Sequence, residues 1–265
     1  MNALDEVTLT PTALLAVDVV VFTLRPAPVE QSWQVLLVRQ SDAGHPPQPR
    51  MRHAVELRDV ASAGSEGVRY ALPGVLVEAD ETFDGAARRA LAVKAGLDAR
   101  DWYLEQLATF GSPTRDTRAR VASVAHIALV RSDDLAFSSS AAADAVEWHP
   151  VGEIPWDALA FDHAAMLREA IQRVRGKVRY AWVLFQLLPP VFTISELRAA
   201  YAAIRDPDVM HLSTSNMRKL FGRLIERGML VPVGERAQAK GRGRPGDLFR
   251  FSGPLTGTWA RELPW

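Results

Sequence analysis

The stretch that most constrains the fold is LPGVLVEADETFDGAARRALAVKAGL, residues 72–97. It opens with a short apolar run and a turn, and its second half is rich in Ala and Arg and free of Pro. Asp84 is a good N-cap residue and Gly96 a good C-cap residue, so the sequence predicts a helix between them. The stretch therefore predicts a strand, a turn and a helix that ends at a glycine.

Four runs rich in apolar residues, the first two of them also β-branched, predict that this unit belongs to a sheet. They lie at residues 15–24, 33–39, 102–111 and 120–131. We expect the first two to pair with one another as strands, and the last two to pair across a charged turn. Residues 162–186 instead repeat apolar side chains at helical spacing, which predicts one long helix or two helices that break near Gly176.

The C-terminal third of the chain has a different order of elements. Residues 193–204 predict a helix with Ser195 as its N-cap, and residues 213–230 predict a second helix that stops at a glycine. Two short strand-like runs follow, around a tip rich in Gly and basic residues. Helix, turn, helix and hairpin is the order of a winged helix-turn-helix. We therefore expect two domains, residues 1–175 and residues 176–265.

The charge balance differs between these two parts, although the net charge of the chain is zero. Residues 1–176 carry 17 Lys and Arg against 24 Asp and Glu, a balance of −7, whereas residues 177–265 carry 14 against 7, a balance of +7. A basic C-terminal part favours a polyanionic partner, most simply nucleic acid. A basic surface that only aids solubility is the alternative that charge alone leaves open.

The composition also limits the compartment. The absence of cysteine excludes disulfides and thiolate metal sites, and it fits a reducing cytoplasm. The longest apolar run, ALLAVDVVVFTL, is interrupted by Asp18 and is too short to span a bilayer. No basic stretch precedes it, so no signal peptide is expected. We therefore expect a cytoplasmic location and no membrane partner.

The stretch 72–97 resembles the Nudix box, whose pattern is Gly, five residues, Glu, seven residues and then Arg-Glu-apolar-x-Glu-Glu-x-Gly-apolar. Glu81 takes the place of the first Glu and Arg89 that of the Arg, and a Gly-apolar pair closes the pattern. Val75 stands where the pattern has its first Gly, directly after Gly74. The resemblance implies an α/β Nudix sandwich, here followed by a C-terminal winged helix-turn-helix domain.

Ala90, Val93 and Lys94 stand where the Nudix box has its helix carboxylates. In Nudix hydrolases those carboxylates share one helix face and hold Mg²⁺ against a pyrophosphate. None of the three replacements can ligate a hard cation through a carboxylate, so we expect no catalytic residue and no metal site. Restoring Glu at all three positions is expected to create Mg²⁺ binding, with only the Val93 change placing a charge in the core.

Two further segments, FGSPTRDTRARVASVAHIALV and VEWHPVGEIPWDALAFDHAAMLREA, resemble parts of ADP-ribose-type Nudix domains. The candidate effector-binding residues are Arg69, Glu81, Arg89, Lys94, Arg118 and Phe161. Lys94 has two interpretations. Its ammonium replaces part of the charge of a metal opposite the ligand pyrophosphate, or it is a solvated lysine near a helix C-terminus, where the helix dipole favours a cation.

The basic tip of the expected hairpin contains GRGRP, residues 241–245, which matches the core of an AT-hook. Gly lets such a backbone lie deep in the minor groove while the Arg side chains reach into its negative potential. The expected recognition helix adds hydroxyl, amide and cationic side chains. The candidate DNA-contacting residues are Ser213, Thr214, Ser215, Asn216, Arg218, Lys219, Arg223, Lys240, Arg242 and Arg244. A flexible basic hairpin and a plain solvated helix face are the alternatives.

A degenerate Nudix domain followed by this tail resembles the Nudix-related transcriptional regulator (NrtR) family over nearly the whole chain. The most specific matches are SPTRDTRARV, AFDHAAML, RGKVRYAWVLFQLLPPVFTISELRAAY, SNMRKL and GRGRPGDLFRF. The resemblance implies a homodimeric repressor of NAD metabolism genes that binds a pseudo-palindromic double-stranded DNA operator, needs no cofactor and senses ADP-ribose or a related nucleotide. Two alternatives remain: a Nudix pyrophosphohydrolase with displaced metal ligands, and a regulator whose Nudix domain is only a dimerisation scaffold.

Overall fold

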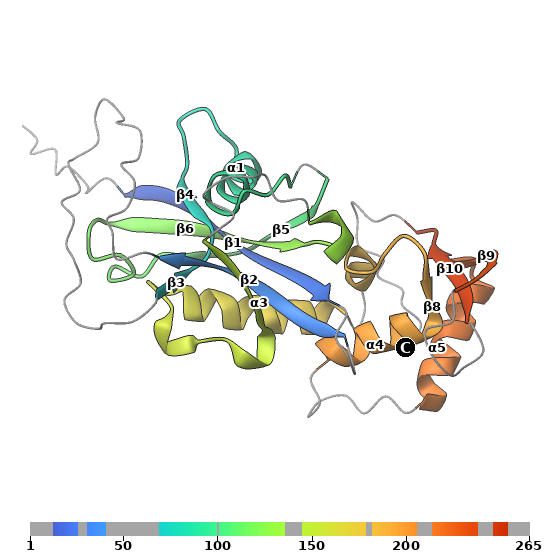
Figure 1. Ribbon diagram of the computed structural model, residues 1–265. Coiled ribbons are helices and arrows are strands. Elements are labelled where there is room, and N and C mark those ends of the chain that lie inside the picture. Colours follow the sequence, from blue (N-terminus) through green and yellow to red (C-terminus); the bar gives the residue numbers. More distant parts are fainter. Residues whose placement is uncertain are drawn as a thin grey trace, which may run out of the picture.

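The computed structural model describes residues 13–25, 31–40, 69–99, 101–135, 145–178, 182–205, 214–237 and 246–253, and of residues 214–218 it describes only the backbone. Within these ranges the chain forms an N-terminal α/β part and a smaller C-terminal part, which lies beyond one end of the large sheet (Figure 1). The expected order, an α/β part followed by a winged helix, is confirmed.

The N-terminal part is built on a mixed sheet, which has seven strands in the described ranges. The strands are β1 (Leu14–Arg25), β2 (Ser32–Gln40), β3 (Arg69–Ala71), β4 (Gly74–Leu76), β5 (Tyr103–Phe110), β6 (Val121–Leu129) and β7 (Val146–Pro150). Their order is β3-β2-β1-β6-β5, with β4 paired to β1 and β7 paired to β2. The two expected pairings, β1 with β2 and β5 with β6, are confirmed and antiparallel, whereas β1 and β6 run parallel.

The central strand β1 is buried on both faces of the sheet, because a helix covers each face (Figure 1). Val17, Val19 and Val21 pack in the layer of helix α1 (Phe83–Ala95), and Val20, Phe22 and Leu24 pack in the layer of helix α3 (His163–Lys177). Successive residues of a strand point to opposite faces, so a strand buried twice appears in the sequence as a continuous apolar run.

Capping residues determine where helix α1 begins and ends. Its N-cap is Thr82, whose Oγ1 accepts a hydrogen bond from the backbone N–H of Gly85 at 3.1 Å. The expectation that Asp84 caps the helix is wrong, because Asp84 lies in the first turn, where a negative charge favours the helix dipole. Gly96 ends the helix with a φ of 64°, the left-handed conformation in which Gly carries no steric cost.

The second long helix, α3, ends at Lys177, so residues 162–186 form two elements and not one. Gly176 lies within the last turn of α3, and a 3-10 turn follows at Trp182–Gln186. Other short 3-10 turns lie at Ser132–Asp134, Val151–Glu153 and Trp156–Ala158.

The C-terminal part has the expected order of a winged helix. It consists of β8 (Phe192–Thr193), α4 (Ile194–Ile204), α5 (Thr214–Glu226), β9 (Leu230–Arg236) and β10 (Asp247–Phe251). The strands form a sheet in the order β8-β10-β9, and a backbone hydrogen bond from Ala237 to Gly246 closes the base of the wing. Gly228 stops α5 with a φ of 68°, as expected.

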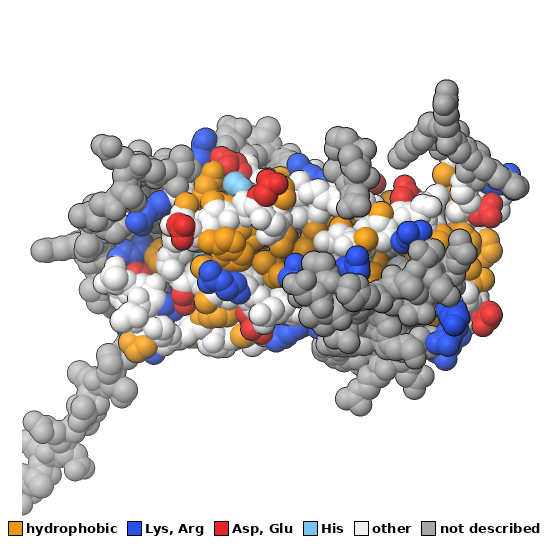
Figure 2. Space-filling model, turned by 90° about the horizontal axis from the view of Figure 1, so that it is seen from below, with side chains coloured by type: hydrophobic (Ala, Val, Ile, Leu, Met, Phe, Trp, Pro, Cys, Tyr) orange, Lys and Arg blue, Asp and Glu red, His pale blue; other side chains and the backbone are white. Residues whose placement is uncertain are grey.

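The apolar core continues from the N-terminal part into the C-terminal part. One cluster joins Trp33 of β2 and Val178 after α3 to Phe185, Leu197 and Ile204 near the winged helix. On the side of the molecule where α3 lies, exposed hydrophobic side chains gather along the middle of the face, with charged side chains scattered around them (Figure 2). None of the helices in the described ranges is both long and apolar enough to cross a lipid bilayer.

The start of α4 is fixed by a capping box, and not by Ser195 as expected. Thr193 Oγ1 accepts from the N–H of Glu196 at 3.1 Å, and the Glu196 carboxylate accepts from the N–H of Thr193 at 2.8 Å. Replacing Thr193 with Ala removes one half of this exchange and is expected to lower the free energy of unfolding by about 1 kcal/mol. Chemical denaturation followed by circular dichroism measures the loss.

The matched control is Ser195→Ala, because Ser195 is exposed on the same helix. A loss of stability in Ser195→Ala as large as that in Thr193→Ala would contradict the assignment of the cap.

Candidate effector site and DNA-binding surface

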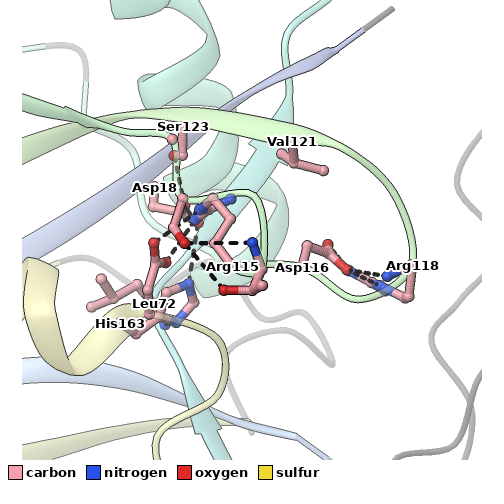
Figure 3. A network of polar contacts seen from close by, with 12 residues as sticks. Asp18, Leu72, Arg115, Asp116, Arg118, Val121, Ser123 and His163 are labelled. Atoms are coloured by element: carbon pink, nitrogen blue, oxygen red, sulfur yellow. Dashed lines mark hydrogen bonds and ion pairs between the residues drawn. The ribbon is translucent and has the colours of Figure 1, made fainter. Parts of the chain in front are cut away.

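The polar residues nearest to the start of α3 form a buried network around Asp18 of β1 (Figure 3). Ser123 of β6 donates a hydrogen bond to Asp18 Oδ2 at 2.7 Å, and Arg115 Nη2 lies 3.2 Å from the same oxygen. His163 Nε2 lies 3.6 Å from Oδ1. His163 Nδ1 accepts the N–H of Leu72 at 2.9 Å, which leaves its proton on Nε2, facing Asp18.

Arg115 extends this network to the N-cap of α3. Its Nε and Nη2 donate to the two carboxylate oxygens of Asp162 at 3.1 and 2.9 Å, a bidentate pair. One guanidinium, with 5% of its side chain exposed, therefore balances two carboxylates. These contacts join β1, the loop before β6 and the first residue before α3.

The ionisation of Asp18 reflects its partners. Burial by itself would raise the pKa of the Asp18 carboxyl, but its contacts with His163, Ser123 and Arg115 outweigh burial and lower the pKa below its ordinary value of 3.8. The charged form of Asp18 is therefore the form that stabilises the fold.

Gly74 allows β4 to approach this network closely. A Cβ atom at residue 74 would lie 2.1 Å from Asp18 Oδ1, which is far inside van der Waals contact. Since Asp18 is held by its partners, any larger residue at 74 would displace the carboxylate. Gly74, one residue before the position of Gly in the Nudix pattern, thus serves the packing of β4 on β1.

Two of the candidate effector residues, Arg118 in the loop before β6 and Phe161 in the turn before α3, lie close together. The Arg118 guanidinium is 5.3 Å from the centre of the Phe161 ring and donates two hydrogen bonds to the Asp116 carboxylate, at 3.0 and 2.8 Å. Asp116 and Arg118 point away from the buried network, whereas Arg115 points into it (Figure 3). Phe161 is 43% exposed and directly precedes the N-cap Asp162.

Two other candidates, Glu81 and Arg89, pair with one another. Arg89 donates to both carboxylate oxygens of Glu81 at 2.8 and 2.6 Å and to the carbonyl oxygen of Leu76 at 2.7 Å. The hydrogen bonds from Arg89 lower the pKa of Glu81. The pair ties the turn after β4 to α1. Their proposed role in effector binding stays a prediction.

The three positions that replace the helix carboxylates do not share one environment. Ala90 is fully buried against the sheet, Val93 is 57% exposed and Lys94 is half-buried. The expectation that only a charge at residue 93 would enter the core is wrong, because residue 90 is the one that faces the core. Among the described residues, no group of three His, Cys, Asp or Glu side chains is placed to hold a metal ion.

The remaining effector candidate, Arg69, begins β3 opposite Gln40 of β2 and is half-buried. Its role and that of Lys94 stay predictions. The residues of the buried network, Asp18, Ser123, Arg115, Asp162 and His163, were not among the candidates predicted from the sequence. The available signals were the lone Asp inside the apolar run of β1 and the Asp-His pair that follows Phe161.

The candidate DNA-binding surface consists of α5 and the wing. Phe221 and Leu224 of α5 are buried, whereas Lys219 and Arg223 are exposed on the helix. Thr214, Ser215, Asn216 and Arg218 lie in the first turns of α5, where only the backbone is described, and Ser213, Lys240, Arg242 and Arg244 lie outside the described residues. The arrangement presents a recognition helix with cationic side chains next to a β-hairpin.

The chain thus joins a Nudix-type α/β domain to a winged helix, a kind of domain that binds DNA in helix-turn-helix proteins. The NUDIX domain model matches residues 14–172, and the model of the NrtR DNA-binding winged helix domain matches residues 184–251. The chain is 30% identical over 250 residues to the ADPR responsive transcriptional repressor NtrR of Acinetobacter baylyi, covering 91% of this chain and 83% of that protein. The chain therefore belongs to the NrtR family of Nudix-related transcriptional regulators.

Solved structures agree with this assignment. The chain is similar to NrtR of Shewanella oneidensis, with a TM-score of 0.64 and 26% identity over 90% of this chain and 94% of that one. It is also similar to the same protein in complex with a 27mer DNA, with a TM-score of 0.63 and 25% identity over 89% of this chain and 93% of that one.

Because Asp18 is buried, replacing it is expected to change the free energy of unfolding in a way that depends on pH. Asp18→Asn removes one charge from a buried network and is expected to lower the free energy of unfolding by about 3–5 kcal/mol at neutral pH. Because the folded-state pKa of Asp18 is lowered, its contribution is present above its ordinary value of 3.8 and is lost as pH falls through the folded-state pKa. The gap between wild type and variant is therefore expected to narrow below about pH 4.

Urea denaturation between pH 3 and pH 8 measures this gap. Asp101→Asn is the control, because Asp101 is exposed. A gap between wild type and Asp18→Asn that stays constant over the whole pH range would refute the assigned role of the Asp18 charge.

Proposed function

We propose that this protein is a transcriptional repressor that binds double-stranded operator DNA through its winged helix and responds to ADP-ribose or a related nucleotide through its Nudix domain. One combination of features carries the proposal. The chain keeps the paired Glu81 and Arg89 of a Nudix box, lacks the three helix carboxylates, and joins this domain to a winged helix. The relative from Acinetobacter baylyi, which is called ADPR responsive, supports the identity of the effector.

A sensor gains from the pocket of a hydrolase but not from its turnover. An effector shifts the population of protein conformers only while it is bound, and a protein that destroys its effector loses that control. Ala90, Val93 and Lys94 offer no carboxylate for Mg²⁺, so we infer that the Nudix domain binds a nucleotide without cleaving it.

We propose further that the protein acts as a homodimer in the cytoplasm, on a pseudo-palindromic operator of NAD metabolism genes. Helix-turn-helix proteins commonly meet such sites as two-fold dimers, whose two recognition helices lie one helical turn of DNA apart. We assign effector binding to residues 1–175 and DNA binding to residues 176–265.

A gel-shift titration tests the proposed function. The protein is expected to bind DNA from upstream of its own coding sequence, and ADP-ribose is expected to change that affinity by about 5- to 150-fold, the usual range of coupling between two sites. In the same preparation, ADP-ribose with Mg²⁺ or Mn²⁺ is expected to remain uncleaved, as chromatography of the nucleotide would show.

The two assays separate the competing functions. Metal-dependent release of AMP and ribose 5-phosphate would favour a hydrolase over a sensor. DNA binding that ADP-ribose leaves unchanged, together with no heat of ADP-ribose binding in calorimetry, would favour a Nudix domain that is only a scaffold.

The exposed cations of α5 allow a second test. Lys219 and Arg223 are exposed, and we expect them to contact phosphates. Each lost phosphate contact flattens the log-log dependence of DNA affinity on salt by about one unit. The Lys219→Ala, Arg223→Ala double variant is therefore expected to flatten that slope by about two units. Fluorescence anisotropy of labelled operator DNA at several salt concentrations measures it.

The control variant is Arg39→Ala, which also removes an exposed arginine, but from β2 of the N-terminal part. It is expected to leave the salt dependence of DNA affinity unchanged. An equal slope in wild type and in the double variant would remove these two residues from the DNA interface.

A further inference from the structure

The last two turns of α3 carry three cations at alternate positions, Arg173, Arg175 and Lys177, which bind two different parts of the molecule. Arg173 Nη1 and Lys177 Nζ both donate to the carboxylate of Glu105 on β5, Arg173 at 3.3 Å. Arg175 Nε instead donates to the carbonyl oxygen of Ile204, the last residue of α4, at 3.2 Å. The end of α3 is therefore tied to the large sheet on one side and to the winged helix on the other.

Lys177 differs from the other two cations because its side chain is almost completely buried. Only 4% of it is exposed, against 33% for Arg173, and the Glu105 carboxylate beside it is 16% exposed. Burying an ammonium group is unfavourable unless a countercharge and hydrogen bonds compensate for it. Glu105 supplies that charge, and the Tyr103 hydroxyl donates to the same carboxylate and lies 3.4 Å from Lys177 Nζ. The buried position of Lys177 thus depends on Glu105.

The pair of Glu105 and Lys177 lies where the chain passes from the α/β part into the winged helix. Lys177 is the last residue of α3, and Val178 directly after it belongs to the apolar cluster that continues to Leu197 of α4. The pair is at the opposite end of α3 from Asp162 and thus away from the buried polar network at the start of this helix.

We propose that Glu105 is a positioning residue for DNA binding: through Lys177 it fixes the last turn of α3, and this turn holds α4 through Arg175. The inference rests on the proposed DNA-binding function and adds a residue of the α/β part to it. A winged helix that is held at a fixed angle loses less orientational freedom when it meets DNA, so binding costs less. Without the Glu105 charge, the Lys177 ammonium gains by reaching water, which opens the last turn of α3 and releases the Arg175 contact.

Glu105→Gln tests this role, because it keeps the size of the side chain and removes its charge. Amide hydrogen exchange in residues 173–178 is expected to become faster, while exchange in β1 and β6 stays as in wild type. Affinity for labelled DNA from upstream of the protein's own coding sequence, measured by fluorescence anisotropy, is expected to fall on the order of tenfold.

A second variant, Glu105→Gln with Lys177→Met, removes both charges and keeps an unbranched side chain at residue 177. A buried ion pair can be replaced by apolar groups of similar volume with little loss. The double variant is therefore expected to regain slow exchange in residues 173–178 and to bind the same DNA within about threefold of wild type.

The matched control is Glu169→Gln. Glu169 is also a carboxylate near Arg173, at 3.7 Å, but it is 45% exposed and lies on α3 itself. It is expected to leave both hydrogen exchange in residues 173–178 and DNA affinity as in wild type.

The outcomes separate the role of Glu105 from the function of the protein. Wild-type exchange at residues 173–178 in Glu105→Gln, or no recovery in the double variant, overturns the pairing of Glu105 with Lys177 as the anchor of α3. Faster exchange there with unchanged DNA affinity overturns the positioning role, while the repressor function stands. Wild-type protein that does not bind this DNA overturns the proposed function, and the positioning role with it.

Discussion

The packing of β1 against the start of α3 depends on one guanidinium that is shared by two carboxylates. Each buried charge costs several kcal/mol to desolvate, so such a triad is tolerated only when its geometry is well made and its remaining hydrogen bonds are satisfied. Arg115 meets Asp162 through two hydrogen bonds and Asp18 through one, while Ser123 donates to Asp18. The strand β1, the loop before β6 and the start of α3 therefore hold one another in position.

Helix α3 connects this triad to the DNA-binding part. Its 15 residues span about 22 Å, from the Asp162 cap to the junction with the winged helix (Figure 1). In its last turns, Arg175 donates to the carbonyl oxygen of Ile204 at 3.2 Å and lies 5.8 Å from the centre of the Trp33 ring. A cation at the C-terminus of α4 is favoured by the helix dipole. Helix α3 thus carries the Asp162 pair at one end and the contact with α4 at the other.

The sequence predicted the fold well because its elements carry strong local signals. Apolar runs located the strands β1 and β2, and a glycine located the end of helix α5. The errors at helix starts concern caps: Thr82 and Thr193 cap α1 and α4, whereas Asp84 and Ser195 lie two residues further on. Several Ser, Thr and Asp residues near a helix start can each serve as cap, and tertiary packing of the first turn selects one of them.

The candidate site was harder to predict because its centre is made by distant residues. Asp18 and Arg115 are 97 positions apart, and Arg115 and Asp162 are 47 apart. No local spacing relates them, so only the pairing of β1 with β6 and the return of α3 bring them together. Arg118 and Phe161, in contrast, were both candidates from a resemblance of their segments, and the fold places them in contact.

The burial of Ala90 changes how the lost metal face is understood. Its side chain packs with Val17, Val19 and Leu91 in the layer between α1 and the sheet, and nothing of it reaches solvent. A carboxylate at this position would be desolvated among aliphatic side chains and would either destabilise the fold or stay protonated, and a protonated carboxyl is a poor ligand for Mg²⁺. Glu at residues 93 and 94 meets no such obstacle. The altered Nudix box therefore differs from a catalytic one in two ways. It lacks three carboxylates, and one of the three positions, residue 90, is now part of the apolar core.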